Sequence, residues 1–109
     1  MDTSQAVDAF SALSHETRLT VFKLLLKEGE QGLSAGVIAR QLEVQPSTLT
    51  SHLHILKRSG LLQSTRQQQK IVYSADIQGT RNLLRFLTQE CCQGHPEICS
   101  DLFGSVKAC

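Results

Sequence analysis

The residues best suited to chemistry lie together near the end of the chain, in the stretch ECCQGHPEIC at residues 90 to 99. Three of the four cysteines, Cys91, Cys92 and Cys99, stand there, and the fourth is the last residue, Cys109. Thiolates are soft ligands that select soft metal and metalloid ions. The cluster therefore predicts a soft-ion site, while a redox switch and a cluster without any ligand remain alternatives.

The N-terminal residues indicate the cellular compartment, and the compartment determines whether the cysteines are reduced or oxidised. The N-terminus carries Asp2 and no basic stretch, and no run approaches the roughly 20 apolar residues of a membrane span. We therefore expect a cytoplasmic protein without a membrane partner. In a reducing cytosol, clustered cysteines indicate metal binding or redox chemistry rather than a disulfide framework.

The spacing of the cysteines decides whether their sulfur atoms can meet. Adjacent helical residues point about 100° apart, so Cys91 and Cys92 can share an ion only where a helix ends. Gly94 and Pro96 indicate such an end, and Pro96 can begin a new turn that carries Cys99 back toward the other two. We therefore predict that these three cysteines form one site.

The donor set leaves the identity of the ion open. Three thiolates neutralise trivalent arsenic or antimony, whose lone pair fills the remaining direction. Zinc prefers four ligands in a tetrahedron, and cadmium is considered beside it as a soft divalent ion. A fourth ligand for either metal would come from His95, Cys109 or water.

The charge of the chain is unevenly distributed. The formal net charge is only +1, but the stretch from residue 34 to residue 70 contains five basic residues and one acidic residue. Both flanking parts of the chain are net acidic. A locally basic middle in a nearly neutral protein predicts a surface directed at a polyanion.

Hydrophobic periodicity predicts a series of short helices and one hairpin. Helices are expected at residues 4 to 12, from about 15 to 29, at 34 to 42, at 46 to 59 and from 80 to about 93, with a hairpin at 61 to 76. Ser14 and Ser34 are the predicted N-caps of the second and third helices. The first helix carries Val7 and Phe10. The residues predicted to supply buried or apolar faces of the next three helices are Leu19, Phe22, Leu25, Leu26, Ala35, Ile38, Ala39, Leu42, Leu49, Leu53 and Leu56.

This order predicts a mainly α fold with a β-hairpin wing, a winged helix-turn-helix. We expect residues 1–109 to form a single domain, with residues 90–109 as the segment that binds an inducer. A small domain with one recognition helix gains affinity by covering two half-sites, so a homodimer is expected. Leu84, Leu87 and Cys91 continue one stripe that could form its interface.

Three segments resemble the ArsR/SmtB family of arsenic- and metal-responsive repressors. They are LSHETRLTVFKLL (13–25), VQPSTLTSHLHILKRSGLL (44–62) and RQQQKIVYSAD (66–76), which match the entry helix, the recognition helix and the wing. The resemblance implies a repressor that binds operator DNA and releases it when its inducer binds. It also favours trivalent arsenic over zinc, because the family contains arsenic repressors with relocated cysteine triads.

Two departures from the family pattern concern the sensor. Many arsenic sensors of the family have a Cys-x-Cys motif before the recognition helix, but Leu33 to Leu42 contains no cysteine. Zinc sensors use Asp and His on the last helix, and residues 80 to 90 contain neither. The cluster of Cys91, Cys92 and Cys99 is therefore the remaining candidate for an inducer site.

A recognition helix needs short side chains on its exposed N-terminal half, so that its backbone can approach base edges in the major groove. Basic side chains beside it position the protein on phosphates without reading sequence. His52 is interpreted as a packing residue and is left out of the set. The predicted DNA-binding residues are Ser47, Thr48, Thr50, Ser51, His54, Lys57, Arg58, Arg66 and Lys70.

Three other functions stay open as alternatives. Within regulation, the cysteines would sense zinc, cadmium or thiol oxidation instead of arsenic. A thiol enzyme, such as an arsenate reductase, is disfavoured because the chain has neither a phosphate-binding loop nor a C-x-x-C motif. A protein-interaction module with a zinc-stabilised tail would bind zinc but no DNA. We expect a regulator and no enzymatic activity.

Overall fold

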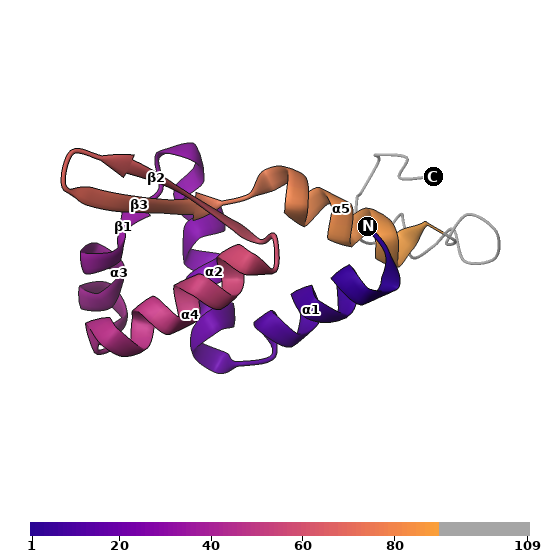
Figure 1. The fold of residues 1–109 in the computed structure, drawn as a ribbon, viewed down its shortest axis with the longest axis horizontal. Helices are drawn as coiled ribbons and strands as arrows, with labels where there is room; N and C mark the ends of the chain where they lie inside the picture. The colour runs from indigo at the N-terminus through magenta and orange to yellow at the C-terminus, as the bar shows by residue number, and fades with distance from the viewer. Residues whose placement is uncertain (90–109) are drawn as a thin grey trace.

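The computed structural model describes residues 1–89, and Figure 1 shows a small sheet along one edge of the molecule, with the helices below it and beyond one of its ends. The predicted domain limits and the predicted inducer segment 90–109 extend beyond the described residues. A winged helix-turn-helix is confirmed. Its elements are α1 (Thr3–Leu13), α2 (Glu16–Glu28), the 3₁₀ turn η1 (Gly29–Gln31), β1 (Leu33–Ser34), α3 (Ala35–Leu42), α4 (Pro46–Arg58), β2 (Leu62–Gln67), β3 (Lys70–Ala75) and α5 (Ile77–Thr88).

Helices α3 and α4 form the helix-turn-helix pair. The Ser34 side chain accepts a hydrogen bond from the Val37 N–H, which caps α3 as predicted. Glu43 has a positive φ of 54° and ends α3, and Pro46 then starts α4 at a position where its missing N–H costs nothing. The predicted stripe of α4 is confirmed, because Leu49, Leu53 and Leu56 are all buried.

The wing is the hairpin of β2 and β3. These strands pair antiparallel with Arg66 opposite Ile71 and Gln67 opposite Lys70. Gln68 adopts a φ of 59° at the tip, a conformation that more often falls to glycine. The two-residue strand β1 was not predicted, and it pairs with β3 to give the sheet order β1-β3-β2.

The junction between α1 and α2 differs from the prediction. Ser14 is the C-cap of α1, and its hydroxyl donates to the Ser11 carbonyl at 2.7 Å. The N-cap of α2 is therefore His15, whose Nδ1 accepts from the Thr17 N–H at 3.1 Å. The serine was the better N-cap by residue type, but it is already used to close the preceding helix.

The buried face of α1 is made of small residues, and that of α2 differs in part from the prediction. In α1 the buried residues are the alanines Ala6, Ala9 and Ala12, whereas the larger apolar side chains Val7 and Phe10 are exposed. In α2, Phe22 and Leu25 are buried as expected. Leu19 and Leu26 are exposed, and Val21 is buried in their place.

Helix α5 begins earlier than predicted and rests on the end of α4. Asp76 caps it by accepting the Gly79 N–H at 2.9 Å, and the Asp76 N–H donates to the Leu61 carbonyl, also at 2.9 Å. A Cβ atom on Gly79 would lie 1.9 Å from the Gly60 carbonyl oxygen. The absence of a side chain therefore permits a close backbone contact between α5 and the turn that follows the recognition helix.

Candidate nucleic-acid interface

The nine predicted DNA-binding residues lie on α4 and on the two strands of the wing, and every one of them is exposed. Seven are on α4, while Arg66 is on β2 and Lys70 on β3. On α4 they occupy the sides left free by the buried leucine stripe. The exposed members of α4 are Ser47, Thr48, Thr50, Ser51, His54, Lys57 and Arg58.

Two properties of α4 suit a helix that enters a major groove. Its first half presents hydroxyl groups on short side chains, which allow close approach to base edges. Thr50 is partly committed, because its hydroxyl donates to the Pro46 carbonyl at 2.9 Å, so toward DNA it can act only as an acceptor. Lys57 and Arg58 occupy the last turn, where the helix dipole favours cations.

The wing and α3 share a basic groove that the sequence prediction did not include. The groove has a volume of about 450 Å³ and is lined by residues of the α3 N-terminal half and by Gln69, Lys70 and Ile71. Arg40 of α3 lies on the same groove. Arg40 was counted in the basic stretch of the sequence, but only the fold places it beside Lys70.

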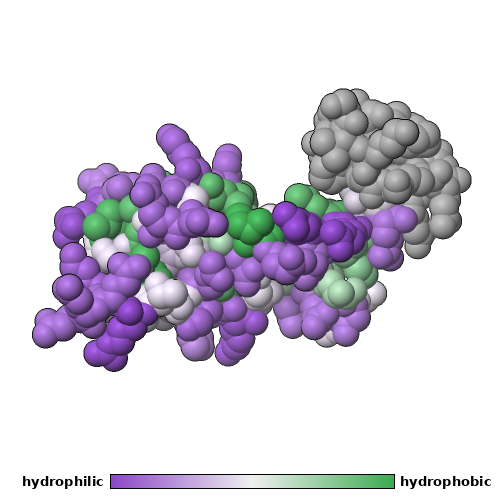
Figure 2. All heavy atoms as spheres, turned by 90° about the horizontal axis from the view of Figure 1, so that it is seen from above, coloured by the Kyte–Doolittle hydropathy of each residue, from purple (hydrophilic) through white to green (hydrophobic). Residues whose placement is uncertain are grey.

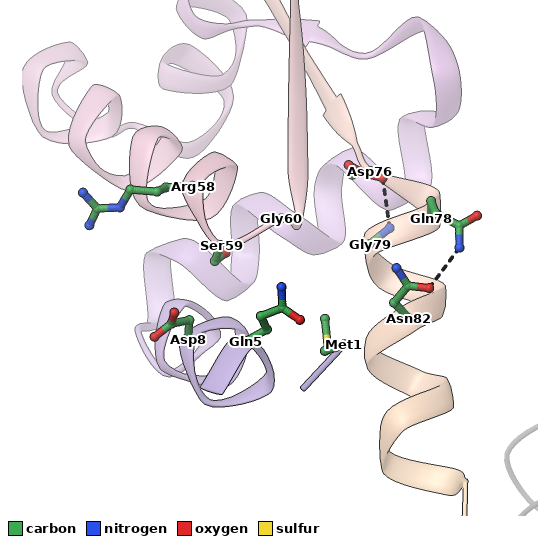
Figure 3. Close-up of a pocket in the computed structure, with 10 residues that line it drawn as sticks. All are labelled: Met1, Gln5, Asp8, Arg58, Ser59, Gly60, Asp76, Gln78, Gly79 and Asn82. Atoms are coloured by element: carbon green, nitrogen blue, oxygen red, sulfur yellow. Dashed lines mark hydrogen bonds between the residues drawn. The ribbon is translucent and has the colours of Figure 1, made fainter. Parts of the chain in front are cut away.

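Arg58 differs from the other basic candidates in its surroundings. It lines a cleft of about 440 Å³ between α1, the end of α4 and the start of α5, together with Asp8 and Asp76. Figure 3 shows the Arg58 guanidinium pointing away from Gly60 and Gly79, with Asp8 on the neighbouring helix α1. Arg58 therefore lies at the edge of the surface formed by α1 and α5, and its guanidinium is directed toward solvent.

A cluster of one arginine and two histidines joins α4 to the α1–α2 junction. The Arg18 Nε donates to the Ala12 carbonyl at 2.7 Å, and an Arg18 terminal nitrogen lies 3.2 Å from the His52 Nδ1. Because a guanidinium can only donate, the Nδ1 of His52 is the acceptor. The imidazole rings of His15 and His52 lie 4.5 Å apart between centroids. The prediction of His52 as a packing residue with a satisfied nitrogen agrees with these contacts.

The environment of His52 disfavours its charged form. Burial lowers the pKa of His52 below its ordinary value of 6.5, and the nearby His15 and Arg18 lower this pKa further. No anionic group contributes to the shift of the pKa. The cluster of His15, Arg18 and His52 is thus held together without a compensating carboxylate.

Helices α1 and α5 carry large apolar side chains that nothing covers in the described part of the chain. They lie beside each other at the end of the molecule away from the wing (Figure 1). Figure 2 shows apolar side chains among hydrophilic ones at the middle of the face seen from above. The exposed apolar residues of the two helices are Val7, Phe10, Ile77, Leu84 and Leu87.

The predicted metal ligands lie beyond the part of the chain that the structure describes. Cys91, Cys92 and Cys99 lie outside the described residues, and so do His95 and Cys109. Within residues 1–89, no group of three or more His, Cys, Asp or Glu side chains is arranged to hold a metal ion. No helix within that same range is long and apolar enough to cross a membrane.

Comparison with known proteins agrees with the fold. Residues 13–65 match the family model described as a helix-turn-helix domain, a segment that runs from the end of α1 into β2, the first strand of the wing. The ArsR-like transcriptional regulator from Rhodococcus sp. RHA1 has a similar structure, with a TM-score of 0.73 at 25% identity. The match covers 94% of this chain and 96% of that chain. Fold and surface together define a DNA-binding transcriptional regulator of the winged helix-turn-helix class.

Two relatives are similar over most of their length. The chain is 31% identical over 88 residues to the HTH-type transcriptional regulator YgaV from Escherichia coli, covering 81% of this chain and 87% of that protein. It is 28% identical over 94 residues to the transcriptional activator HlyU from Vibrio cholerae, covering 86% and 84%. Both are regulators of transcription. The chain belongs to the same family of HTH-type transcriptional regulators as YgaV, and its structure is similar to that of an ArsR-like regulator.

Proposed function

We propose that this protein is a homodimeric repressor that holds operator DNA and releases it when trivalent arsenic or antimony binds Cys91, Cys92 and Cys99. The observation that carries the proposal is the sequence ECCQGHPEIC, which offers three thiols directly after the region of α5. Helix α3 has no cysteine and α5 has no histidine, so neither can supply the sensor sites that the sequence resemblance implies for this scaffold.

The exposed surface of α4 and the wing supports operator binding. Ser47 and Ser51 present short hydroxyl side chains from the first half of α4, and Arg66 and Lys70 flank them from the wing. In this arrangement the hydroxyl groups reach base edges, and the basic residues contact phosphates. The affinity is then strongly salt dependent, since each neutralised phosphate releases a counterion.

The uncovered apolar side chains of α1 and α5 support the homodimer. Leu84 is 40% exposed and Leu87 is 57% exposed, and Phe10 of α1 is 41% exposed. Covering such side chains with the same helices of a second copy stabilises both subunits at about 25 cal/mol per Å² of apolar surface. A two-fold dimer then presents two recognition helices to a palindromic operator.

The proposal is tested by titrating the purified reduced protein onto the DNA upstream of its own gene, with and without arsenite, under anaerobic conditions. Tight salt-dependent binding and release by arsenite are expected. The Cys99→Ser variant should bind DNA normally and stay bound in arsenite. Cys109→Ser is the matched control and should respond like the wild type. Release of the Cys99→Ser variant at the same arsenite concentration would refute the three-cysteine site.

The same titration separates the alternatives. Zinc and cadmium are added in parallel, and peroxide is a separate challenge, because adjacent Cys91 and Cys92 are also the arrangement for a thiol-oxidation sensor. A response to zinc, cadmium or peroxide without one to arsenite would overturn the proposed inducer and leave the regulator. One relative is named an activator, so in-vitro transcription from the same promoter tests the sign, and we expect inhibition that arsenite relieves.

A further inference from the structure

We propose that His15, Arg18 and His52 form a binding site for one phosphate of the DNA backbone. This inference rests on the proposed DNA binding and assigns a contact outside the surface of α4 and the wing. Arg18 and His52 are half-buried and His15 is exposed, and the three side chains meet where the α1–α2 junction lies beside the middle of α4 (Figure 1).

The hydrogen bonds of the cluster fix which ring atoms face a ligand. The Nδ1 of His15 accepts the Thr17 N–H, and the Nδ1 of His52 accepts from Arg18. A neutral imidazole whose Nδ1 accepts must carry its proton on Nε2. Each ring therefore offers an Nε2–H donor from the side opposite its internal hydrogen bond, and the two rings are neighbours.

The electrostatics of the cluster call for an anion. His15 and Arg18 both lower the pKa of His52, and no carboxylate offsets them. From the elements packed against α4, the groups that face His52 are His15 and Arg18 at the start of α2, with the Ala12 carbonyl of α1 bound to Arg18. Neither α3 nor β2 adds a charge that shifts the pKa of His52. Glu16, the acidic residue nearest in sequence, is exposed and does not contribute.

The position of His52 on α4 places the cluster at the margin of the predicted DNA surface. Thr48, a predicted DNA contact, lies four residues before His52 and so on the same side of the helix. Ser51, another predicted contact, is the preceding residue. A backbone strand that passes Thr48 therefore continues toward the His15–His52 pair, where two N–H donors and a guanidinium can hold a phosphate oxygen.

The test is a double-mutant cycle between the protein and single phosphates of a duplex that the protein selects from a random-sequence pool. Each phosphate in turn is replaced by an uncharged methylphosphonate, and the affinities of the wild type, His52→Leu and His15→Asn are measured. Asparagine retains the N-cap of α2 while removing the imidazole. One phosphate should lose about tenfold in affinity on replacement in the wild type and much less in both variants.

A matched control shows whether removing any histidine of α4 affects the same phosphate. His54→Leu changes an exposed histidine of α4 and should couple to a different phosphate or to none. If neither His52→Leu nor His15→Asn couples to any phosphate, the cluster is only a structural link and the inference is wrong. If no duplex is enriched at all, the proposed DNA binding fails instead. Should His52→Leu unfold, the exposed His15→Asn substitution decides.

Discussion

The contact between Gly79 and Gly60 yields the sharpest prediction for a single substitution, Gly79→Ala. The added Cβ would lie 1.9 Å from the Gly60 carbonyl oxygen, so the two backbones must separate by about 1.5 Å to reach ordinary contact. That shift breaks the hydrogen bond from the Asp76 N–H to the Leu61 carbonyl, which is 2.9 Å long. Gly60 is held in place because its N–H donates to the Lys57 carbonyl and the Leu61 N–H donates to the Leu56 carbonyl.

The magnitude follows from opposing terms. Overpacking costs about 1 to 3 kcal/mol, and the lost hydrogen bond costs about 1 kcal/mol more. Alanine recovers up to about 1 kcal/mol through its better helix propensity. The free energy of unfolding of Gly79→Ala should therefore be lower than that of the wild type by about 1 to 4 kcal/mol.

Urea denaturation at a fixed protein concentration measures this difference, and Gly36→Ala is the matched control. Gly36 is also helical and exposed, and no atom lies within 4 Å of the position its Cβ would take. The control should be as stable as the wild type or up to about 1 kcal/mol more stable. Equal stability of Gly79→Ala and Gly36→Ala would show that α5 does not rest on the turn after α4.

Three further predictions concern the dimer, the wing and the response to acid. Leu87→Lys should shift the protein toward monomers in analytical ultracentrifugation, whereas Ile71→Lys, an exposed residue of the wing, should not; unchanged association of Leu87→Lys would place the interface elsewhere. Arg66→Ala and Lys70→Ala should each weaken operator binding and reduce the slope of log affinity against log salt concentration by about one, with little change in DNA sequence preference. A variant with a changed sequence preference and an unchanged salt slope would contradict a phosphate contact at that residue. Because folding lowers the pKa of His52, the unfolded chain takes up a proton at this residue before the folded chain does. The free energy of unfolding should therefore fall as the pH drops through 6.5, the ordinary pKa, and level off below the pKa of the folded state. His52→Gln retains an acceptor for Arg18, and urea titrations across that pH range should show that this variant lacks the pH-dependent loss of stability due to His52.

The recognition helix could be predicted from sequence because its signals agree. Pro46 marks its start, the leucines at 49, 53 and 56 mark one narrow stripe, and Gly60 marks its end. Helix α2 shows no clear division into an apolar and a polar face, since it is apolar at Leu19, Val21, Phe22 and at positions 24 to 26. Periodicity cannot choose a buried face on a helix that is apolar over most of its circumference, so tertiary packing decided it.

The strand β1 and the role of Arg18 depend on contacts between residues far apart in the sequence, which a local sequence pattern does not reveal. The two-residue strand β1 forms because Gly32 and Leu33 pass against Tyr73, and a Cβ on Gly32 would meet the Tyr73 carbonyl oxygen at 2.2 Å. Likewise Arg18 appeared in the sequence only as part of the family pattern. Its two hydrogen bonds span 6 and 34 residues, so its role between α1 and α4 required the fold.

The contact of α5 with the turn after α4 also offers a mechanical link for the proposed sensor. Gly60 is held to the last turn of α4 by its N–H, which donates to the Lys57 carbonyl, and the Leu61 N–H donates to the Leu56 carbonyl. Because Gly79 meets Gly60 backbone to backbone, no flexible side chain absorbs a displacement of α5 there. A change of α5 orientation within the dimer must then move the end of the recognition helix. Since Cys91 follows the described end of α5 closely in sequence, ion capture and DNA release would be linked through this one contact.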